Sequence, residues 1–146
     1  TVNTKIRNTK GVRFHRYEKK LTYVHWCNFF SSVIAKAIID QYKPIAPHIT
    51  FKKSNQIEIL KYEEGGFYTP HVDHFTEIPR TISVIIFVND DFEGGDFEMF
   101  SPDKKHSQKV KPKKGRTIIF PSNFLYPHKA NIVTKGTRYA IVIWNL

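Results

Sequence analysis

The chain has 146 residues, of which 40% are hydrophobic, and it carries 23 Lys and Arg against 13 Asp and Glu, a formal charge of +10. This length and composition exclude a disordered or fibrous chain, and they predict one domain over residues 1–146 with a core of its own. Cys27 is the only cysteine, which excludes an internal disulfide and a multi-cysteine zinc site. A single cysteine favours a reducing compartment, so we expect a cytoplasmic protein.

The apolar runs in the sequence are short. The longest, residues 82–88, is interrupted by Ser83 and is too short to cross a bilayer. No basic start followed by an apolar stretch and a small-residue cleavage site is visible, so a secretory signal is not recognisable. We therefore expect no contact with a membrane.

The order of the predicted elements indicates the fold class. Residues 1–24 are polar and basic, and we expect one or two strands there. From Trp26 to Tyr42 apolar residues recur at helical spacing, which predicts a helix that Pro44 ends. Short apolar runs between turn sequences then predict strands at 56–62, 67–73, 80–88, 96–100, 116–120 and 138–144. One helix beside six or more strands predicts an antiparallel barrel or sandwich, because a doubly wound fold would need crossover helices.

Two histidines and an aspartate carry the strongest chemical signal. If residues 67–73 are extended, His71 and Asp73 point to one face, about 7 Å apart, and both can reach one ion. His128 must then come from a different strand. These ligands leave three positions open on an octahedral ion, which suits a non-haem Fe(II) oxygenase. A zinc hydrolase could use the same ligands but would need an additional general base. His74 should face away and be exposed.

An arginine begins the last predicted strand. Arg138 would be costly to bury without a partner, and its planar fork matches a carboxylate. Alone it would indicate a strand-edge arginine paired with Asp or Glu. Beside the His, Asp and His set it indicates an anchor for an anionic cosubstrate.

These residues resemble the Fe(II)/2-oxoglutarate-dependent dioxygenases, specifically the prolyl 4-hydroxylase and hypoxia-factor prolyl hydroxylase branch. Residues 62–73 are similar to the family's Tyr-x-x-Gly-x-x-Tyr-x-x-His-x-Asp box, and Pro127-His128 with Arg138, Tyr139 and Trp144 is similar to its last two strands. The resemblance runs from about Gln56 to the C-terminus. It implies a mainly β fold, a double-stranded β-helix (jelly roll) with an N-terminal supporting helix, and a single dioxygenase domain over 1–146.

The resemblance also implies roles for individual residues. Tyr62 would contribute a hydroxyl near the iron or the cosubstrate, Arg80 would stand near the substrate entrance, and Trp144 would line the pocket. The implied iron ligands are His71, Asp73 and His128, and the implied anchor for the distal carboxylate of 2-oxoglutarate is Arg138.

The chain departs from this pattern at one position. Hypoxia-type members usually carry a tyrosine that binds the distal carboxylate where this chain has Phe87. Another donor, such as Thr117 or Ser83, must then serve, or the affinity for the cosubstrate differs.

The implied activity is hydroxylation of a C–H bond, first of all in a prolyl residue of a protein or peptide. Fe(II), 2-oxoglutarate and O2 would be required, succinate and CO2 released, and ascorbate is a further candidate cofactor. The basic segment 104–116 leaves a nucleic-acid-modifying dioxygenase open, although a solvated loop is the simpler interpretation, and the DNA-repair branch typically has a second arginine in its last strand where this chain is apolar. A non-catalytic jelly-roll binding module is the third alternative, which the intact ligand set disfavours.

Overall fold

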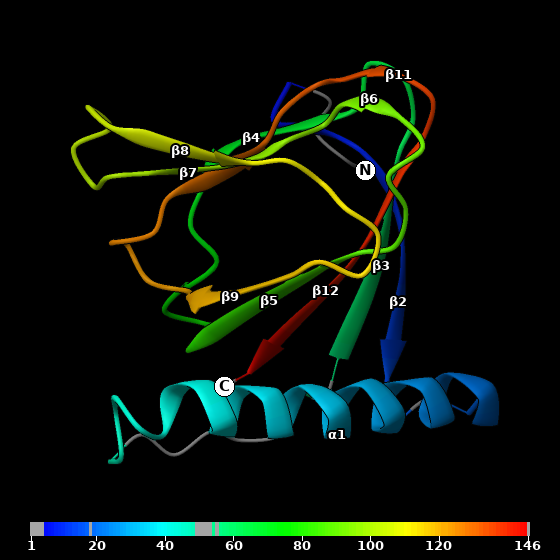
Figure 1. The fold of residues 1–146 in the computed structure, drawn as a ribbon. Helices are drawn as coiled ribbons and strands as arrows, with labels where there is room; N and C mark the ends of the chain where they lie inside the picture. Colours follow the sequence, from blue (N-terminus) through cyan, green and yellow to red (C-terminus); the bar gives the residue numbers. More distant parts are fainter. Residues whose placement is uncertain (1–4, 18, 49–53, 55, 146) are drawn as a thin grey trace.

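The computed structural model describes residues 5–17, 19–48, 54 and 56–145. Within them the chain forms two strands, one long helix and then further short strands (Figure 1). The elements in chain order are β1 (Arg7–Asn8), β2 (Lys10–His15), α1 (Leu21–Tyr42), β3 (Gln56–Tyr62), β4 (Phe67–His71), β5 (Ile82–Phe87), β6 (Glu93–Gly94), β7 (Phe97–Phe100), β8 (Ser107–Val110), β9 (Thr117–Pro121), β10 (His128–Ala130), β11 (Val133–Lys135) and β12 (Arg138–Asn145).

Two antiparallel sheets face one another across the core. Each has five strands within the described residues. The larger sheet, which has the longer strands, has the order β2-β3-β12-β5-β9, and the smaller sheet has the order β1-β4-β10-β7-β8. The strands β11 and β6 pair in a separate ribbon. Figure 1 shows α1 on the side of the larger sheet that faces away from the smaller one. This arrangement confirms the mainly β jelly roll with an N-terminal supporting helix.

The central strands of the larger sheet are buried on both faces, and their side chains point alternately into two cores. On β12, Ala140 and Val142 pack toward the smaller sheet, whereas Ile141 and Ile143 pack toward α1. Because side chains alternate along a strand, a strand covered on both sides becomes continuously apolar. The apolar run that ends the sequence therefore marks the centre of this sheet.

The supporting helix presents one buried stripe. Cys27, Ser31, Ile34 and Ile38 are buried at helical spacing, as expected for a helix on a sheet. The predicted end before Pro44 is confirmed, but the predicted start at Trp26 is wrong. The helix begins at Leu21, where Lys20 gives no side-chain cap and the sequence carries no start signal.

Each of the six strands predicted with bounds overlaps an observed one, and the separate strand expected to carry His128 is β10. The strands β6, β8 and β11 were not predicted, because with two to four residues each they are too short to show an alternating pattern. The extended segment predicted at 67–73 ends earlier, at His71. Among the described residues, no helix is long and apolar enough to cross a membrane.

A buried carboxylate ties strands of the smaller sheet together. Glu98 on β7 accepts hydrogen bonds from Ser107 on β8 and from Asn131, at 2.7 and 3.0 Å, and pairs with Lys129 on β10 at 3.0 Å. Burial opposes the ionisation of Glu98, but these three donors outweigh it and lower its pKa from 4.5 to about 2. The ionised carboxylate therefore stabilises the sheet that carries His128.

Glu98→Gln is expected to destabilise the protein at pH 7 by about 1–2 kcal/mol, because charge-assisted hydrogen bonds are lost. A lowered pKa means that the contribution of Glu98 is fully present above about pH 4.5 and is lost as the pH falls through about 2. Urea unfolding at pH 7 and pH 3 should show a smaller gap between the two proteins at the lower pH. An equal gap at both pH values would contradict this assignment.

Candidate metal centre and cosubstrate pocket

Two imidazoles lie on neighbouring strands of the smaller sheet. β10 pairs with β4 so that His128 stands opposite His71, and the two rings lie 4.4 Å apart between centroids. Asp73 follows two residues after the end of β4, with its carboxylate oxygens 3.6 Å from Nε2 of each histidine. Donor atoms of these three side chains all lie within 4.8 Å of one another. One ion of ordinary ligand distance fits among them.

Backbone carbonyls fix which nitrogen each histidine presents. Nδ1 of His71 lies 2.9 Å from the carbonyl oxygen of Thr69, and Nδ1 of His128 lies 3.0 Å from that of Tyr126. A carbonyl oxygen only accepts, so Nδ1 carries a hydrogen in both rings, and in the neutral imidazole Nε2 is then the nitrogen that offers a lone pair toward Asp73. Such outer partners orient the imidazoles of metal sites and fix their tautomer.

The carboxylate of Asp73 is buried and held by a hydroxyl pair. Ser83 donates to Oδ2 of Asp73 at 2.6 Å and lies 2.8 Å from the hydroxyl of Ser122. Burial alone would raise the pKa of Asp73, but His71, His128 and Ser83 lower it well below its usual range. Burial lowers the pKa of His128, with Asp73 opposing the shift. Anionic Asp73 and neutral His128 are the protonation states that bind a metal ion.

Arg138 is buried on the larger sheet, opposite the three candidate ligands. Its cross-strand partner on β3 is Tyr62, and its guanidinium carbon lies 4.7 Å from the centroid of that ring and 5.2 Å from the centroid of Phe87. The side chain is 2% exposed, yet Nε and Nη1 have no hydrogen-bond partner in the described structure. Buried donors of a cation are costly when unsatisfied, so this site fits a bound carboxylate.

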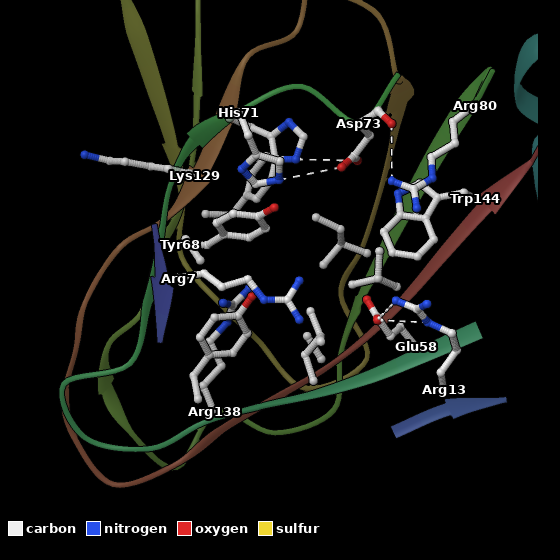
Figure 2. A pocket seen from close by; sticks show the side chains of 18 of the residues that line it. Arg7, Arg13, Glu58, Tyr68, His71, Asp73, Arg80, Lys129, Arg138 and Trp144 are labelled. Atoms are coloured by element: carbon white, nitrogen blue, oxygen red, sulfur yellow. Dashed lines mark hydrogen bonds and ion pairs between the residues drawn. The ribbon is translucent and has the colours of Figure 1, made fainter. Parts of the chain in front are cut away.

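These groups share one cavity of about 220 Å³ between the two sheets. Figure 2 shows His71 and Asp73 at one end of it and Arg138 at the other. Besides these groups and His128, the charged residues that line the cavity are Arg7, Arg13, Glu58, Arg80 and Lys129.

A glycine without space for a side chain lies against Arg138. Gly95 has a φ of +65°, and a Cβ there would stand 3.0–3.1 Å from Phe92, Val133 and Cδ of Arg138. Gly115 has a φ of +79° with open space around its Cβ position. The two glycines therefore have the same backbone requirement but different packing.

Gly115→Ala is expected to cost about 1–2 kcal/mol of stability, because an alanine is unfavourable in the left-handed backbone conformation. Gly95→Ala should cost about 1–3 kcal/mol more, because the new methyl group crowds its three neighbours. Thermal unfolding of both variants measures the difference. Equal losses in the two variants would show that the packing around Gly95 adapts without strain.

Two of the remaining predicted residues line the same cavity, and two suggested donors do not. The guanidinium carbon of Arg80 lies 3.8 Å from the centroid of the Trp144 ring, and both residues line the cavity. His74 is exposed, as predicted. Neither suggested substitute for the missing hydroxyl at Phe87 serves: Ser83 binds Asp73, and Thr117 is exposed with its hydroxyl near the carbonyl oxygen of Gly115.

Sequence reasoning missed an ion pair and a ring stack in this cavity. Arg13 donates to Oε1 of the buried Glu58 through Nε and Nη2, at 3.2 and 2.7 Å. On the predicted strand 56–62, Glu58 lies on the same face as Leu60 and Tyr62. This spacing could have placed a carboxylate in the cavity. Tyr68 stacks on His71 with 3.7 Å between ring centroids. Tyr68 is the second tyrosine of the Tyr-x-x-Gly-x-x-Tyr-x-x-His-x-Asp box, and that position could have indicated a place near the histidine.

A jelly roll with two imidazoles and a carboxylate beside a buried arginine that has two unsatisfied donors has the features of a non-haem metal enzyme that takes an anionic cosubstrate. The model of the 2OG-Fe(II) oxygenase superfamily matches residues 57–145. The chain belongs to this superfamily, and the family itself implies Fe(II) and 2-oxoglutarate.

Relatives by sequence are hydroxylases. Human prolyl 3-hydroxylase 2 is 44% identical over 66 residues, which is 44% of this chain and 9% of that protein. A PKHD-type hydroxylase of Delftia acidovorans is 39% identical over 95 residues, covering 58% of this chain and 40% of the relative. The chain therefore spans less than half the length of either relative.

Solved structures share the fold. A Pseudomonas putida prolyl-4-hydroxylase superposes with a TM-score of 0.77 at 18% identity, covering 99% of this chain and 75% of that one. The Trichoplax adhaerens prolyl hydroxylase, in complex with a peptide fragment of the hypoxia inducible factor oxygen degradation domain, also gives 0.77, at 20% identity, covering 100% of this chain and 66% of that one.

Proposed function

We propose that this protein is an Fe(II)- and 2-oxoglutarate-dependent dioxygenase that hydroxylates a prolyl residue of a protein or peptide. The overall reaction converts 2-oxoglutarate, O2 and a C–H bond into succinate, CO2 and a C–OH group. The observation that carries the proposal is the shared cavity, in which His71, Asp73 and His128 converge at one end and the unpartnered donors of Arg138 lie at the other.

The residues present fit both Fe(II) and 2-oxoglutarate. Two Nε2 lone pairs and an anionic carboxylate are suitable ligands for Fe(II), and the free Nε and Nη1 of Arg138 suit a carboxylate. When bound, Fe(II) and 2-oxoglutarate supply the oxidising power for the C–H bond. The chain supplies ligands that Thr69, Tyr126 and Ser83 hold in orientation, and a buried cation that fixes the cosubstrate.

Three further residues line the cavity and complete the proposed site. The hydroxyl of Tyr62 would lie beside the cosubstrate, because Tyr62 is the cross-strand partner of Arg138. The stacked pair of Arg80 and Trp144 would contact the entering substrate, because both residues are partly exposed at the wall of the cavity. The prolyl class comes from the named relatives. A cytoplasmic location and a need for ascorbate stay predictions.

A nucleic-acid substrate is the second candidate, because of the cations in the segment 104–116. They are exposed on the β7–β8 hairpin and the loop that follows it (Figure 1). We place this candidate second because none of the cations lines the cavity. They are Lys104, Lys105, Lys109, Lys111, Lys113, Lys114 and Arg116.

The test supplies Fe(II), 2-oxoglutarate and O2 together with either proline-containing peptides or methylated oligonucleotides. We expect a peptide to stimulate succinate formation and to gain the mass of one oxygen atom at proline. The same peptide with alanine for proline, and the variant His71→Ala, should show neither effect. Stimulation by oligonucleotides alone would overturn the prolyl proposal in favour of the second candidate.

A further inference from the structure

A second arginine reaches into the cavity from the N-terminal strand. Arg7 on β1 stands opposite Tyr68 of β4, and its guanidinium carbon lies 5.4 Å from the centroid of that ring. Figure 2 shows its side chain extending into the pocket rather than away from it. The structure gives this guanidinium no hydrogen bond or ion pair among the described residues.

In the part of the chain that the structure describes, neither acidic residue of the cavity forms an ion pair with Arg7 or Arg138. Two acidic residues line the cavity, Glu58 and Asp73. Glu58 is paired with Arg13 at 2.7 Å, and Asp73 faces two imidazoles and the hydroxyl of Ser83. Two guanidinium groups in one partly buried space repel each other, so the cavity favours an added anion.

Both cations line the cavity together with Tyr62, and the guanidinium carbon of Arg138 lies 4.7 Å from the centroid of that ring. Burial raises the pKa of the Tyr62 hydroxyl, and the positive charges of Arg138 and Arg7 oppose the shift. The ring of Phe87, on the other side of Arg138, has no donor to offer an anion there.

We propose that Arg7 is a second anchor for the distal carboxylate of 2-oxoglutarate and supplies the donor that Phe87 lacks; this inference rests on the proposed function. A carboxylate has about four acceptor sites. Nε and Nη1 of Arg138 fill two of them, and the fork of Arg7 fills others. Ser83 and Thr117 are directed elsewhere, whereas Arg7 is a charged donor group that lines the cavity in addition to Arg138.

The test compares 2-oxoglutarate with 2-oxopentanoate, which has a methyl group in place of the distal carboxylate. Binding of each to the Mn(II)-loaded protein is measured by calorimetry without turnover. Arg7→Met is expected to weaken 2-oxoglutarate binding about 10-fold, the effect of losing one charge-assisted contact, and 2-oxopentanoate binding less than about 2-fold. Arg7→Lys should recover part of the loss, because it restores the charge without the fork.

Two reference variants separate the possible results. Arg116→Met removes an exposed arginine outside the cavity and should change neither affinity. Arg138→Met should weaken 2-oxoglutarate selectively. If it does so while Arg7→Met changes nothing, or weakens both ligands equally, the inference on Arg7 is overturned and the proposed function stands. If Arg138→Met also fails to discriminate, the carboxylate pocket of the proposed function is misplaced.

Discussion

Asp73→Ala is expected to lower Fe(II)-dependent succinate formation by at least about 100-fold. Loss of an outer partner of a metal ligand already costs about 10–100-fold, and Asp73 is the only anionic ligand proposed. Without it, two neutral imidazoles face the ion, and the charge that offsets a divalent cation is gone. The measurement is succinate formed from 2-oxoglutarate over a range of Fe(II) concentrations.

The neighbouring histidine provides a matched control. His74 is exposed, and its Nδ1 lies 2.9 Å from the carbonyl oxygen of Arg80, so His74→Ala should keep most of the activity. Circular dichroism of both variants checks the fold. Asp73→Ala with wild-type turnover would remove this residue from the metal site.

Arg138→Met is expected to raise the concentration of 2-oxoglutarate needed for half-maximal turnover roughly 10- to 100-fold. Each hydrogen bond between charged groups contributes about 1.5–3 kcal/mol, and every 1.4 kcal/mol is a factor of ten. The maximal rate at saturating cosubstrate should fall much less, because the metal ligands stand at the other end of the cavity. Steady-state kinetics with 2-oxoglutarate varied measures both quantities.

The stability of the same variant gives an independent readout. The buried donors Nε and Nη1 of Arg138 have no hydrogen-bond partner among the described residues, and a buried charge whose donors are unsatisfied is unfavourable. Arg138→Met should therefore unfold at the same urea concentration as the wild type or at a higher one, while it loses the stabilisation that added 2-oxoglutarate gives. A variant that is strongly destabilised without ligand would identify Arg138 as a structural residue instead.

The sequence was sufficient to predict that the three candidate ligands and Arg138 share one site. The backbone geometry that brings them together differs in part from the predicted one. The alternation argument placed His71 and Asp73 on one strand, whereas the strand ends at His71. The backbone N–H groups of Asp73 and His74 instead bond to the carbonyl oxygen of Ser122. Spacing could suggest that the two side chains meet, but that backbone contact depends on a residue far along the chain.

Other features depend on contacts between distant segments and leave no local pattern. Arg7 looks like one more cation in a basic N-terminal stretch until β1 pairs with β4. Ser83 looks like an interruption in an apolar strand, yet it binds Asp73. The strand β10 has three residues, and only its pairing on both sides places His128. Sequence periodicity describes single elements, so it cannot show these pairings.

The central claim is that one cavity holds Fe(II) and 2-oxoglutarate side by side. A crystal structure of the protein with Mn(II) in place of Fe(II) and with 2-oxoglutarate, grown without O2, tests it most directly. We predict one ion bound by Nε2 of His71, Nε2 of His128 and a carboxylate oxygen of Asp73, with the distal carboxylate on Arg138. An ion bound elsewhere, or a cosubstrate whose distal carboxylate lies away from Arg138, would contradict the account.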